Sequence, residues 1–395
     1  MTLRELTTAL GIKNYPEALE AVYNRLDPSD ERICDTSFIG ALEERYGLLG
    51  EYYDTVLAGA RELKSRRELL TWGKLAYAYS KDASRHEASL MPMPSSDGSA
   101  AADALPILAL LREVPLAAKR YADRGFHEEQ IAKNLENIKI NIWVNKITKG
   151  SVSLNQGLYS WLAYYMKAMI FDHKGFNYQP TGWPPHSMLL KNKASGEYAI
   201  LMARGRFTKD GLVLGSAGAV DEDGAFDAEF AETAQTFFGH RAKNGHVQST
   251  FEAFEKTEWE AVLRHGDGVL NLHIPRNTNL DPSYVSESLK EGLALARKHY
   301  PELSLKCIVC TSWLMDPVLA DILGPDAKLS AFGRRFMRHP VMDVTGTGCL
   351  GFVWPGEACP AAALSEKTTL QRGIKGLMLA GDYIRTTAGI LADDL

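Results

Sequence analysis

The chain has 395 residues, of which 45% are hydrophobic and 24% are charged, which excludes a mainly disordered protein and leaves ample apolar material for a buried core. Its formal net charge of -5 at pH 7 argues against a dedicated nucleic-acid binder, because such proteins usually carry a basic surface. No uninterrupted apolar run approaches the ~20 residues that a membrane helix needs.

The N-terminal sequence and the cysteines favour a cytoplasmic protein. Residues 1–6 contain no basic segment that leads into an apolar stretch, which is the pattern of a secretory signal. Five scattered cysteines in a chain of this length do not make the disulfide framework of small secreted domains. We therefore expect a cytoplasmic location, with neither nucleic acid nor a membrane as a partner.

The first part of the chain predicts helices almost throughout. Apolar residues recur three or four positions apart, as in Leu3, Leu6 and Leu10, and this spacing places them on one face of a helix. The pattern continues to about residue 150, and a further helix is expected over 158–171. The Pro- and Gly-rich sequence at 180–185 then forms a break.

Beyond this break, short runs of alternating apolar residues predict strands that are interrupted by helices. The expected strands cover residues 187–191, 197–204, 212–219, 268–275 and 305–313. The expected helices cover residues 228–239, 282–299 and 317–337.

These patterns predict an α+β protein with two domains. Residues 1–182 are expected to form an N-terminal all-α helical domain. Residues 183–395 are expected to form a mixed α/β domain in which helices cover one sheet.

A Cys-x-x-Cys motif at Cys307 and Cys310 is interpreted as part of the core. The motif lies in an apolar, strand-like run, and residues three apart in a strand point to opposite faces. A zinc site would need two further ligands at suitable spacing, and neither a second Cys-x-x-Cys nor a His-x-x-x-His motif is present. We therefore expect no metal cofactor.

The Gly-x-Gly-x-x-Gly motif at residues 346–351 does not predict a dinucleotide site. Such a motif functions when its glycines open a helix whose N-terminus faces the pyrophosphate, but here Pro355 would stop a helix within about one turn. The late segment 376–383 is similar to a flavin-contacting motif, but the N-terminal fingerprint of those flavoproteins is missing. A Gly-x-Ser-x-Gly nucleophile motif and a phosphate-binding Walker A loop are also missing. We therefore expect no flavin and no NAD.

The most informative stretch for function is 268–282. Asn271 and His273 share one face of the expected strand, and Pro275, which brings no N–H, ends it. A polar turn then leads into a helix, and the free N–H groups at a helix N-terminus favour phosphate. Two interpretations fit: a phosphate-binding turn beside a reactive histidine, or a buried structural histidine followed by a helix that Asp281 caps.

Several motifs in the second half of the chain resemble a known family. They are Leu272-His273-Ile274-Pro275, Cys310-Thr311-Ser312-Trp313-Leu314-Met315-Asp316-Pro317, Phe332-Gly333-Arg334-Arg335-Phe336 and Thr368-Thr369-Leu370-Gln371-Arg372. On these residues the chain resembles a bacterial acyltransferase-domain family, in which an N-terminal helical N-acyltransferase domain precedes a GNAT-like C-terminal domain. Similarity also reaches residues 121–126 and 171–176, so it spans nearly the whole chain.

The resemblance implies an enzyme that moves an acyl group from a thioester to an amine. The donor would be of the acyl-CoA type, with an acyl-carrier protein as an alternative, and the acceptor would be a small-molecule amine. The donor phosphates would face the turn after residue 275 and the first turn of the following helix. The residues that this places at the donor are Arg276, Asn277, Asn279 and Ser283.

The same resemblance suggests roles for three residues near the reacting atoms. His273 would take a proton from the attacking amine, since an ordinary imidazole pKa of about 6.5 suits this task near neutral pH. Asn271 would orient the substrate or the imidazole, and Ser312 would hydrogen-bond or protonate the leaving thiolate. The strands at 268–275 and 305–313 would part, because a GNAT-type thioester enters between them.

A second hypothesis is a GNAT-like fold that senses a ligand or binds a partner without turnover. The usual glycine-containing pyrophosphate loop of GNAT proteins is replaced by Arg276-Asn277-Thr278-Asn279-Leu280. Glycines let backbone amides approach a phosphate closely, and a fold does not by itself imply an activity. Turnover with any amine would separate the two hypotheses.

Overall fold

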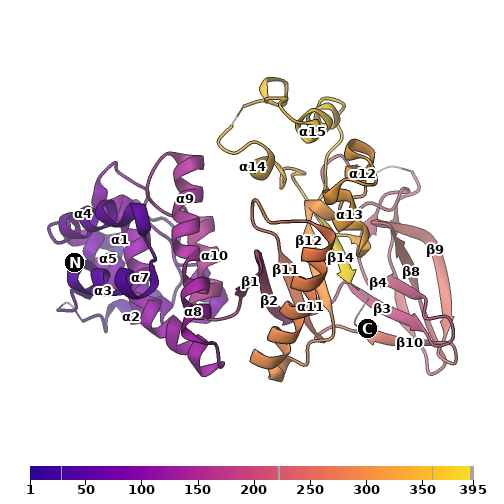
Figure 1. Cartoon of the computed structure of the whole chain (residues 1–395), viewed down its shortest axis with the longest axis horizontal. Helices are drawn as coiled ribbons and strands as arrows, with labels where there is room; N and C mark the ends of the chain where they lie inside the picture. Colours follow the sequence, from indigo (N-terminus) through magenta and orange to yellow (C-terminus); the bar gives the residue numbers. More distant parts are fainter. Residues whose placement is uncertain (28, 221–222, 358, 392–395) are drawn as a thin grey trace. The chain divides into compact units, whose positions relative to one another are not determined.

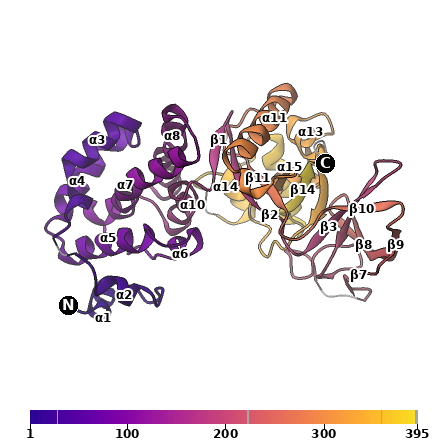
Figure 2. The ribbon, with the colours of Figure 1, turned by 90° about the horizontal axis from the view of Figure 1, so that it is seen from below.

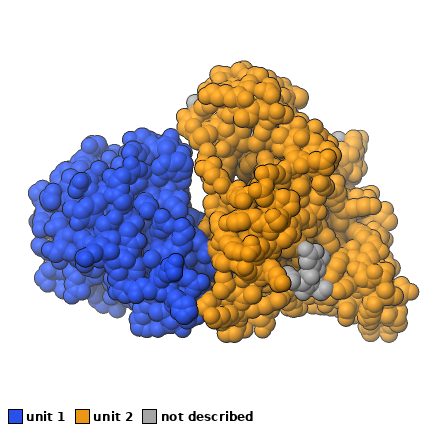
Figure 3. Space-filling view, in the orientation of Figure 1, with its two compact units in different colours: residues 1–172 blue, residues 173–395 orange. Residues whose placement is uncertain are grey.

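Two compact units make up the chain in the computed structural model, which describes residues 1–27, 29–220, 223–357 and 359–391. The first unit spans residues 1–172 and the second spans residues 173–395 (Figure 3). The boundary expected after residue 182 lies ten residues later than this division. The reason is that strand β2 (Phe176–Gly182) belongs to the main sheet of the second unit.

The first unit is helical, as the periodicity predicts. Its longest helix, α7 (Ala100–Asp123), is mostly buried and packs against α4, α5 and α10 (Figure 2). Gly59 of α4 allows a close approach, because a Cβ atom there would lie 2.4 Å from the Cβ of Ala104. The other helices are α1 (Leu3–Ala9), α2 (Leu19–Tyr23), α3 (Thr36–Tyr46), α4 (Tyr53–Leu63), α5 (Arg67–Ser80), α6 (Arg85–Ser89), α8 (Glu128–Leu135), α9 (Asn137–Lys149) and α10 (Gln156–Met166).

Side-chain caps set several of these helix ends. Thr2 and Ser84 each form a capping box with a glutamate three residues later, so that two backbone N–H groups are satisfied at the start of α1 and α6. Gly150 ends α9 in the left-handed conformation, with φ of 81°. Within the described ranges, no helix combines the length and the apolar character that crossing a membrane requires.

The second unit contains a six-stranded main sheet (Figure 1). Its two central strands, β11 and β12, run parallel, whereas β11 pairs antiparallel with β2 and β12 pairs antiparallel with β14. The order across the sheet is β1 (Phe171–His173), β2, β11 (Gly268–His273), β12 (Ile308–Ser312), β14 (Thr387–Leu391) and β13 (Met337–Pro340).

Helices cover one face of the main sheet. The hydroxyl of Tyr178 on β2 donates a 2.8 Å hydrogen bond to the carbonyl oxygen of Ser288 on α11 (Pro282–His299). Phe332 of α13 (Lys328–Arg334) stacks on Phe176 of the same strand, with ring centroids 6.3 Å apart. The remaining helices of this unit are α12 (Val318–Leu323), α14 (Leu350–Val353) and α15 (Thr369–Leu379).

The other face of the main sheet packs against a second sheet. Val269 and Val309 from the main sheet share a core cluster with Leu189 and Ile200 from the second. The second sheet has the order β10 (Trp259–Leu263), β3 (Ser187–Asn192), β4 (Tyr198–Met202), β8 (Thr236–Lys243) and β7 (Phe230–Glu232), and β9 (His246–Glu255) also pairs with β8. Strands β5 (Arg206–Phe207) and β6 (Phe226–Asp227) form a separate ladder.

Three expected elements of the second unit are wrong. Residues 228–239, expected as a helix, contain β7 and the start of β8, because pairing with neighbouring strands overrides the local preference of an Ala- and Glu-rich sequence. Residues 212–219, expected as a strand, form turns in which Gly215 and Gly218 have φ of 87° and 74°. The helix expected over 317–337 is divided into α12 and α13 and ends in strand β13.

The structure shows the surroundings of the Cys-x-x-Cys motif and of the Gly-x-Gly-x-x-Gly motif. Cys307 and Cys310 are both buried and form no disulfide, and burial raises the pKa of Cys310 to about 12. Helix α14 after the 346–351 glycines has four residues and ends before Pro355. No group of three or more His, Cys, Asp or Glu residues in the described ranges is arranged to hold a metal ion.

His339 on β13 is a buried histidine in this core. It is 2% exposed and packs edge-on against Trp183, with ring centroids 5.9 Å apart. Its Nε2 atom is buried and has no hydrogen-bond partner among the described residues. Burial therefore lowers the pKa of His339 to about 4.

We predict that His339 makes the fold less stable at acidic pH. Between pH 6.5 and about 4 the unfolded chain binds a proton at this residue that the folded chain does not. The contribution of neutral His339 to the free energy of unfolding is therefore fully present above pH 6.5. As the pH falls towards 4, this contribution is lost and the free energy of unfolding decreases by about 3 kcal/mol. His339→Phe keeps the ring contact. In urea unfolding, the free energy of unfolding of this variant should fall less steeply between pH 7 and 5 than that of the wild type, with a slope smaller by the equivalent of one proton. An unchanged slope would contradict the prediction.

Candidate active site

The central parallel strands of the main sheet part near their carboxyl ends. Their register contains two pairs, Leu270 with Ile308 and Asn271 with Val309, although β11 continues to His273 and β12 continues to Ser312. Beyond the second pair, each strand keeps its outer neighbour, because β11 remains paired with β2 and β12 with β14. The two central strands are therefore no longer register partners beyond Asn271 and Val309. We refer to the region between their unpaired carboxyl ends as the opening.

Three polar side chains gather on one face of the sheet at this opening. Asn271 and His273 are two residues apart on β11 and therefore share a face, and Gln179 lies opposite Asn271 on β2. The Nε2 atom of His273 is 2.8 Å from Gln179 Oε1, and the Asn271 amide nitrogen is 3.4 Å from the same oxygen. Asn271 Oδ1 is buried and has no hydrogen-bond partner among the described residues. This atom is therefore an acceptor that a bound N–H group can satisfy.

Burial changes the expected chemistry of His273. Removal from water lowers the pKa of its imidazole to about 4, well below the ordinary value assumed from the sequence. The ring is therefore neutral at pH 7 and carries a lone pair. It is a weaker base than an exposed histidine, so it can take protons mainly from acidic N–H groups.

Ser312 lies on the opposite face of the sheet from His273. Asn271 and Val309 are register partners, so alternation puts Thr311 on the face of His273 and Ser312 on the other. The Ser312 hydroxyl oxygen accepts a 3.2 Å hydrogen bond from the backbone N–H of Leu314, at the start of a short 3-10 helix. The structure thus brings Asn271 and His273 together but separates Ser312 from them.

Thr311 is the β12 residue that shares the face of His273. Its side chain is exposed even though β12 is a central strand with neighbours on both sides. Since central strands are usually covered, this exposure indicates that solvent reaches the sheet beside the opening.

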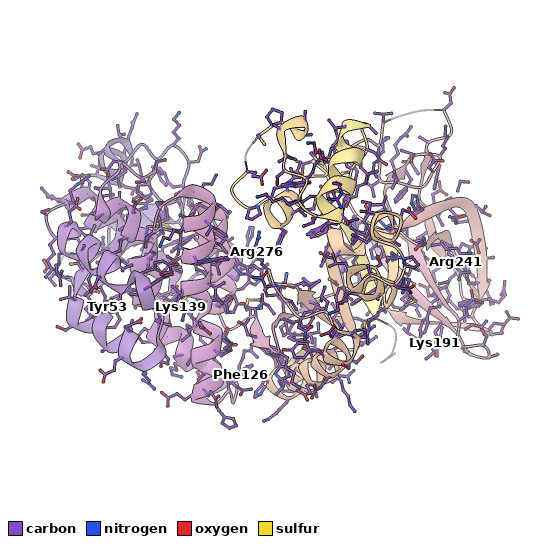
Figure 4. All side chains as sticks on the ribbon, turned by 45° about the horizontal axis from the view of Figure 1, so that its top comes forward. Tyr53, Phe126, Lys139, Lys191, Arg241 and Arg276 are labelled. Atoms are coloured by element: carbon purple, nitrogen blue, oxygen red, sulfur yellow. The ribbon has the colours of Figure 1, made fainter. Side chains whose placement is uncertain are left out.

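The turn after β11 and the first turn of α11 carry the four residues expected to face donor phosphates. Arg276, labelled in Figure 4, donates a 2.5 Å hydrogen bond to the carbonyl oxygen of Gly351. Asn277 is exposed with φ of 64°, and Asn279 Oδ1 accepts a 3.0 Å hydrogen bond from the N–H of Asp281. Ser283 is exposed in the first turn of α11. These four residues therefore lie on one continuous segment next to the opening.

Two further cations lie at the start of α11. Lys328 forms a 2.5 Å ion pair with Asp281, and the Arg335 guanidinium donates a 2.8 Å hydrogen bond to Ser286 Oγ. Asp281 makes no side-chain cap to the helix. The first turn of α11 thus combines a positive dipole end with nearby basic side chains, a combination that favours anions.

Comparison with known proteins finds a family match in the C-terminal part of the chain. Residues 200–391 are similar to the family described as the GNAT-like C-terminal domain. No curated protein matches the chain.

Solved structures share the fold over nearly the whole chain. An acyltransferase mutant in complex with octanoyl-CoA has a TM-score of 0.68. An acyltransferase in complex with decanoyl-CoA and teicoplanin has a TM-score of 0.67, and one in complex with decanoyl-CoA has 0.65. Each is 16% identical, and the match covers 99% of both chains. The coverage includes the helical first unit, and the α+β architecture predicted from the sequence is confirmed.

Sequence reasoning missed Gln179 and Thr311 at the opening, and Lys328 and Arg335 at the start of α11. Gln179 is distant in sequence from His273, and only the register between β2 and β11 places them together. Thr311 lies within a quoted motif, but its exposure depends on the parting of the strands. The Phe-Gly-Arg-Arg-Phe motif contains Arg335 and was a signal that could have been used.

Proposed function

We propose that this protein transfers an acyl group from a thioester donor of the acyl-CoA type to the amine of a small molecule. The observation that carries the proposal is the parting of β11 and β12 beside a basic helix start. An extended pantetheine arm carries amide groups that can pair with strand edges, and its phosphates suit the turn and the first turn of α11. The shared fold with acyltransferases that hold octanoyl-CoA or decanoyl-CoA supports this donor class.

The amine acceptor is supported by chemistry and by one comparison. One of the proteins with this fold holds teicoplanin together with decanoyl-CoA. In the proposed reaction the amine nitrogen attacks the thioester carbonyl, a C–N bond forms and the C–S bond breaks. One proton passes from the nitrogen to the departing sulfur, so that an amide and a free thiol result.

We assign the proton transfer to His273. The nitrogen of a tetrahedral adduct is far more acidic than a free ammonium ion, so a weakly basic, neutral imidazole can accept its proton. The buried oxygen of Asn271 would accept an N–H of the substrate. We assign no proton transfer to Ser312, because its side chain lies on the other face of the sheet.

A binding and a turnover measurement test the proposal. CoA, acetyl-CoA, octanoyl-CoA and an acyl-carrier protein are titrated while the thermal unfolding midpoint is followed. A bound donor should stabilise the fold by ~2.7 kcal/mol at a hundredfold excess over Kd. Release of free thiol is then followed across a panel of amines.

Each outcome discriminates between the hypotheses. Stabilisation by CoA thioesters with thiol release in the presence of an amine supports the transferase. Stabilisation without turnover favours the ligand-sensing module instead. Absence of stabilisation by every CoA compound and by the carrier protein contradicts the donor site altogether.

We further predict that Arg276→Ala weakens donor binding while leaving the fold intact. Arg276 lies on a surface turn and makes one hydrogen bond to the Gly351 carbonyl oxygen, so its loss should change the unfolding free energy by no more than about 1 kcal/mol. Loss of one charge-assisted hydrogen bond to a phosphate should raise the Kd for CoA roughly tenfold or more, as measured by calorimetry. Lys298→Ala removes an equal charge at the far end of α11 and is the control. Equal affinity in the two variants would remove the turn from the site.

A further inference from the structure

We propose that Gln179 is a positioning residue that fixes the proton of His273 on Nε2 and leaves the lone pair on Nδ1. The inference rests on the proposed function, because it is proton transfer that makes the choice of nitrogen matter. Gln179 lies on β2, directly opposite Asn271, and is 9% exposed.

Two contacts of the imidazole bear on its tautomer. His273 Nε2 lies 2.8 Å from Gln179 Oε1, which can only accept a hydrogen bond, and 3.2 Å from the amide nitrogen of Asn271, which can donate one. The shorter contact assigns the proton to Nε2. A neutral imidazole has one N–H, so the basic lone pair is on Nδ1.

Asn271 couples the orientation of its own amide to that of Gln179. The Asn271 amide nitrogen lies 3.4 Å from the same Oε1 atom and is the second donor to it. If the Gln179 amide alone were reversed, its NH2 group would face the NH2 group of Asn271, and His273 would have to give up the proton on Nε2. The mirror arrangement, with both amides reversed and the proton on Nδ1, is the alternative that the test below distinguishes. The two donors therefore hold the oxygen between them, and the three side chains form one oriented network.

The burial of the network makes this orientation persist. Gln179 is almost fully buried, and the lowered pKa of His273 has burial as its cause rather than a neighbouring charge. A carboxylate in place of the Gln179 amide would have the same shape and would add a negative charge at hydrogen-bond distance from Nε2. An opposite charge this close favours the protonated ring and shifts a pKa by roughly 1–3 units.

The test uses the full-length protein with 15N-labelled histidine, because ring nitrogen shifts report the tautomer without any turnover. The wild type should show His273 with its proton on Nε2. Gln179→Glu should keep that tautomer and raise the titration midpoint by one pH unit or more. Gln179→Met should release the ring into a mixture of tautomers. Thr181→Val, the next residue on the same face of β2, is the control and should match the wild type.

A kinetic readout separates this inference from the proposed function. With an acyl-CoA and an amine as substrates, the acid limb of kcat/KM in Gln179→Glu should move upward together with the midpoint seen by NMR. A wild-type proton on Nδ1, or an unchanged tautomer in a folded Gln179→Met variant, would overturn the inference. If the NMR results are as expected but no protein releases thiol, the positioning role stands and the transferase proposal fails.

Discussion

Replacing Glu113 with alanine is expected to destabilise the first unit by about 3–5 kcal/mol, because the buried Lys167 and the half-buried Arg120 would lose their common partner. Glu113 on α7 is 3% exposed at its side chain and accepts from Lys167 at 2.8 Å and from Arg120 at 2.7 Å. Lys167 also donates to the carbonyl of Ser80, and Arg120 to that of Met166. The two cations thus donate hydrogen bonds to backbone carbonyl oxygens at the last residues of α5 and α10, and Glu113 balances their charge.

Local exchange and a matched pair of variants make this prediction specific. Hydrogen exchange followed by mass spectrometry should show faster exchange in α5 and α10 of Glu113→Ala. Glu113→Gln, which keeps an acceptor but no charge, should give an intermediate loss. Asp123→Ala breaks an ion pair with Lys119 on the surface, where the Lys119 side chain is 68% exposed and the Asp123 side chain 60%. This change should cost less than about 1 kcal/mol of unfolding free energy. Equal losses for Glu113→Ala and Asp123→Ala would contradict the role assigned to the cluster.

The helical unit was predictable because its signals are local. The spacing of Leu3 and Leu6 and the caps at Thr2 and Ser84 lie within a few residues of the helices that they specify. In the second sheet, β3 and β4 were predicted, over 187–191 and 197–204. The strands β7 to β10 were not predicted, because they depend on their partners. Residues 236–263 contain β8, which pairs with β4 and β9, and β10, which pairs with β3, and strand preference depends on such packing more than on sequence.

The candidate site divides in the same way. Asn271 and His273 are two residues apart on one strand, so alternation alone places them on one face. The surroundings of these two residues could not be predicted without the fold. The register with β2 places Gln179 beside them, and burial lowers the pKa of His273. The side of the sheet on which Ser312 lies follows from the register with β11, which the sequence does not contain.

His273→Gln is expected to lower kcat/KM by roughly 10²–10⁴-fold, the usual contribution of a positioned general base. Glutamine can still donate to Gln179 Oε1, so the buried network keeps a partner and the thermal midpoint at pH 8 should change little. The wild-type rate should fall as the pH decreases through about 4, because protonation then occupies the lone pair.

The variant should lack this acid limb, since glutamine does not titrate. The control is His265→Gln, the same change at an exposed histidine in the loop before β11, which should keep the wild-type rate. Both rates are measured by thiol release at saturating acyl-CoA. A folded His273→Gln variant with the wild-type rate and an unchanged acid limb would exclude His273 as the base. Ordered water would then have to carry the proton from the attacking nitrogen.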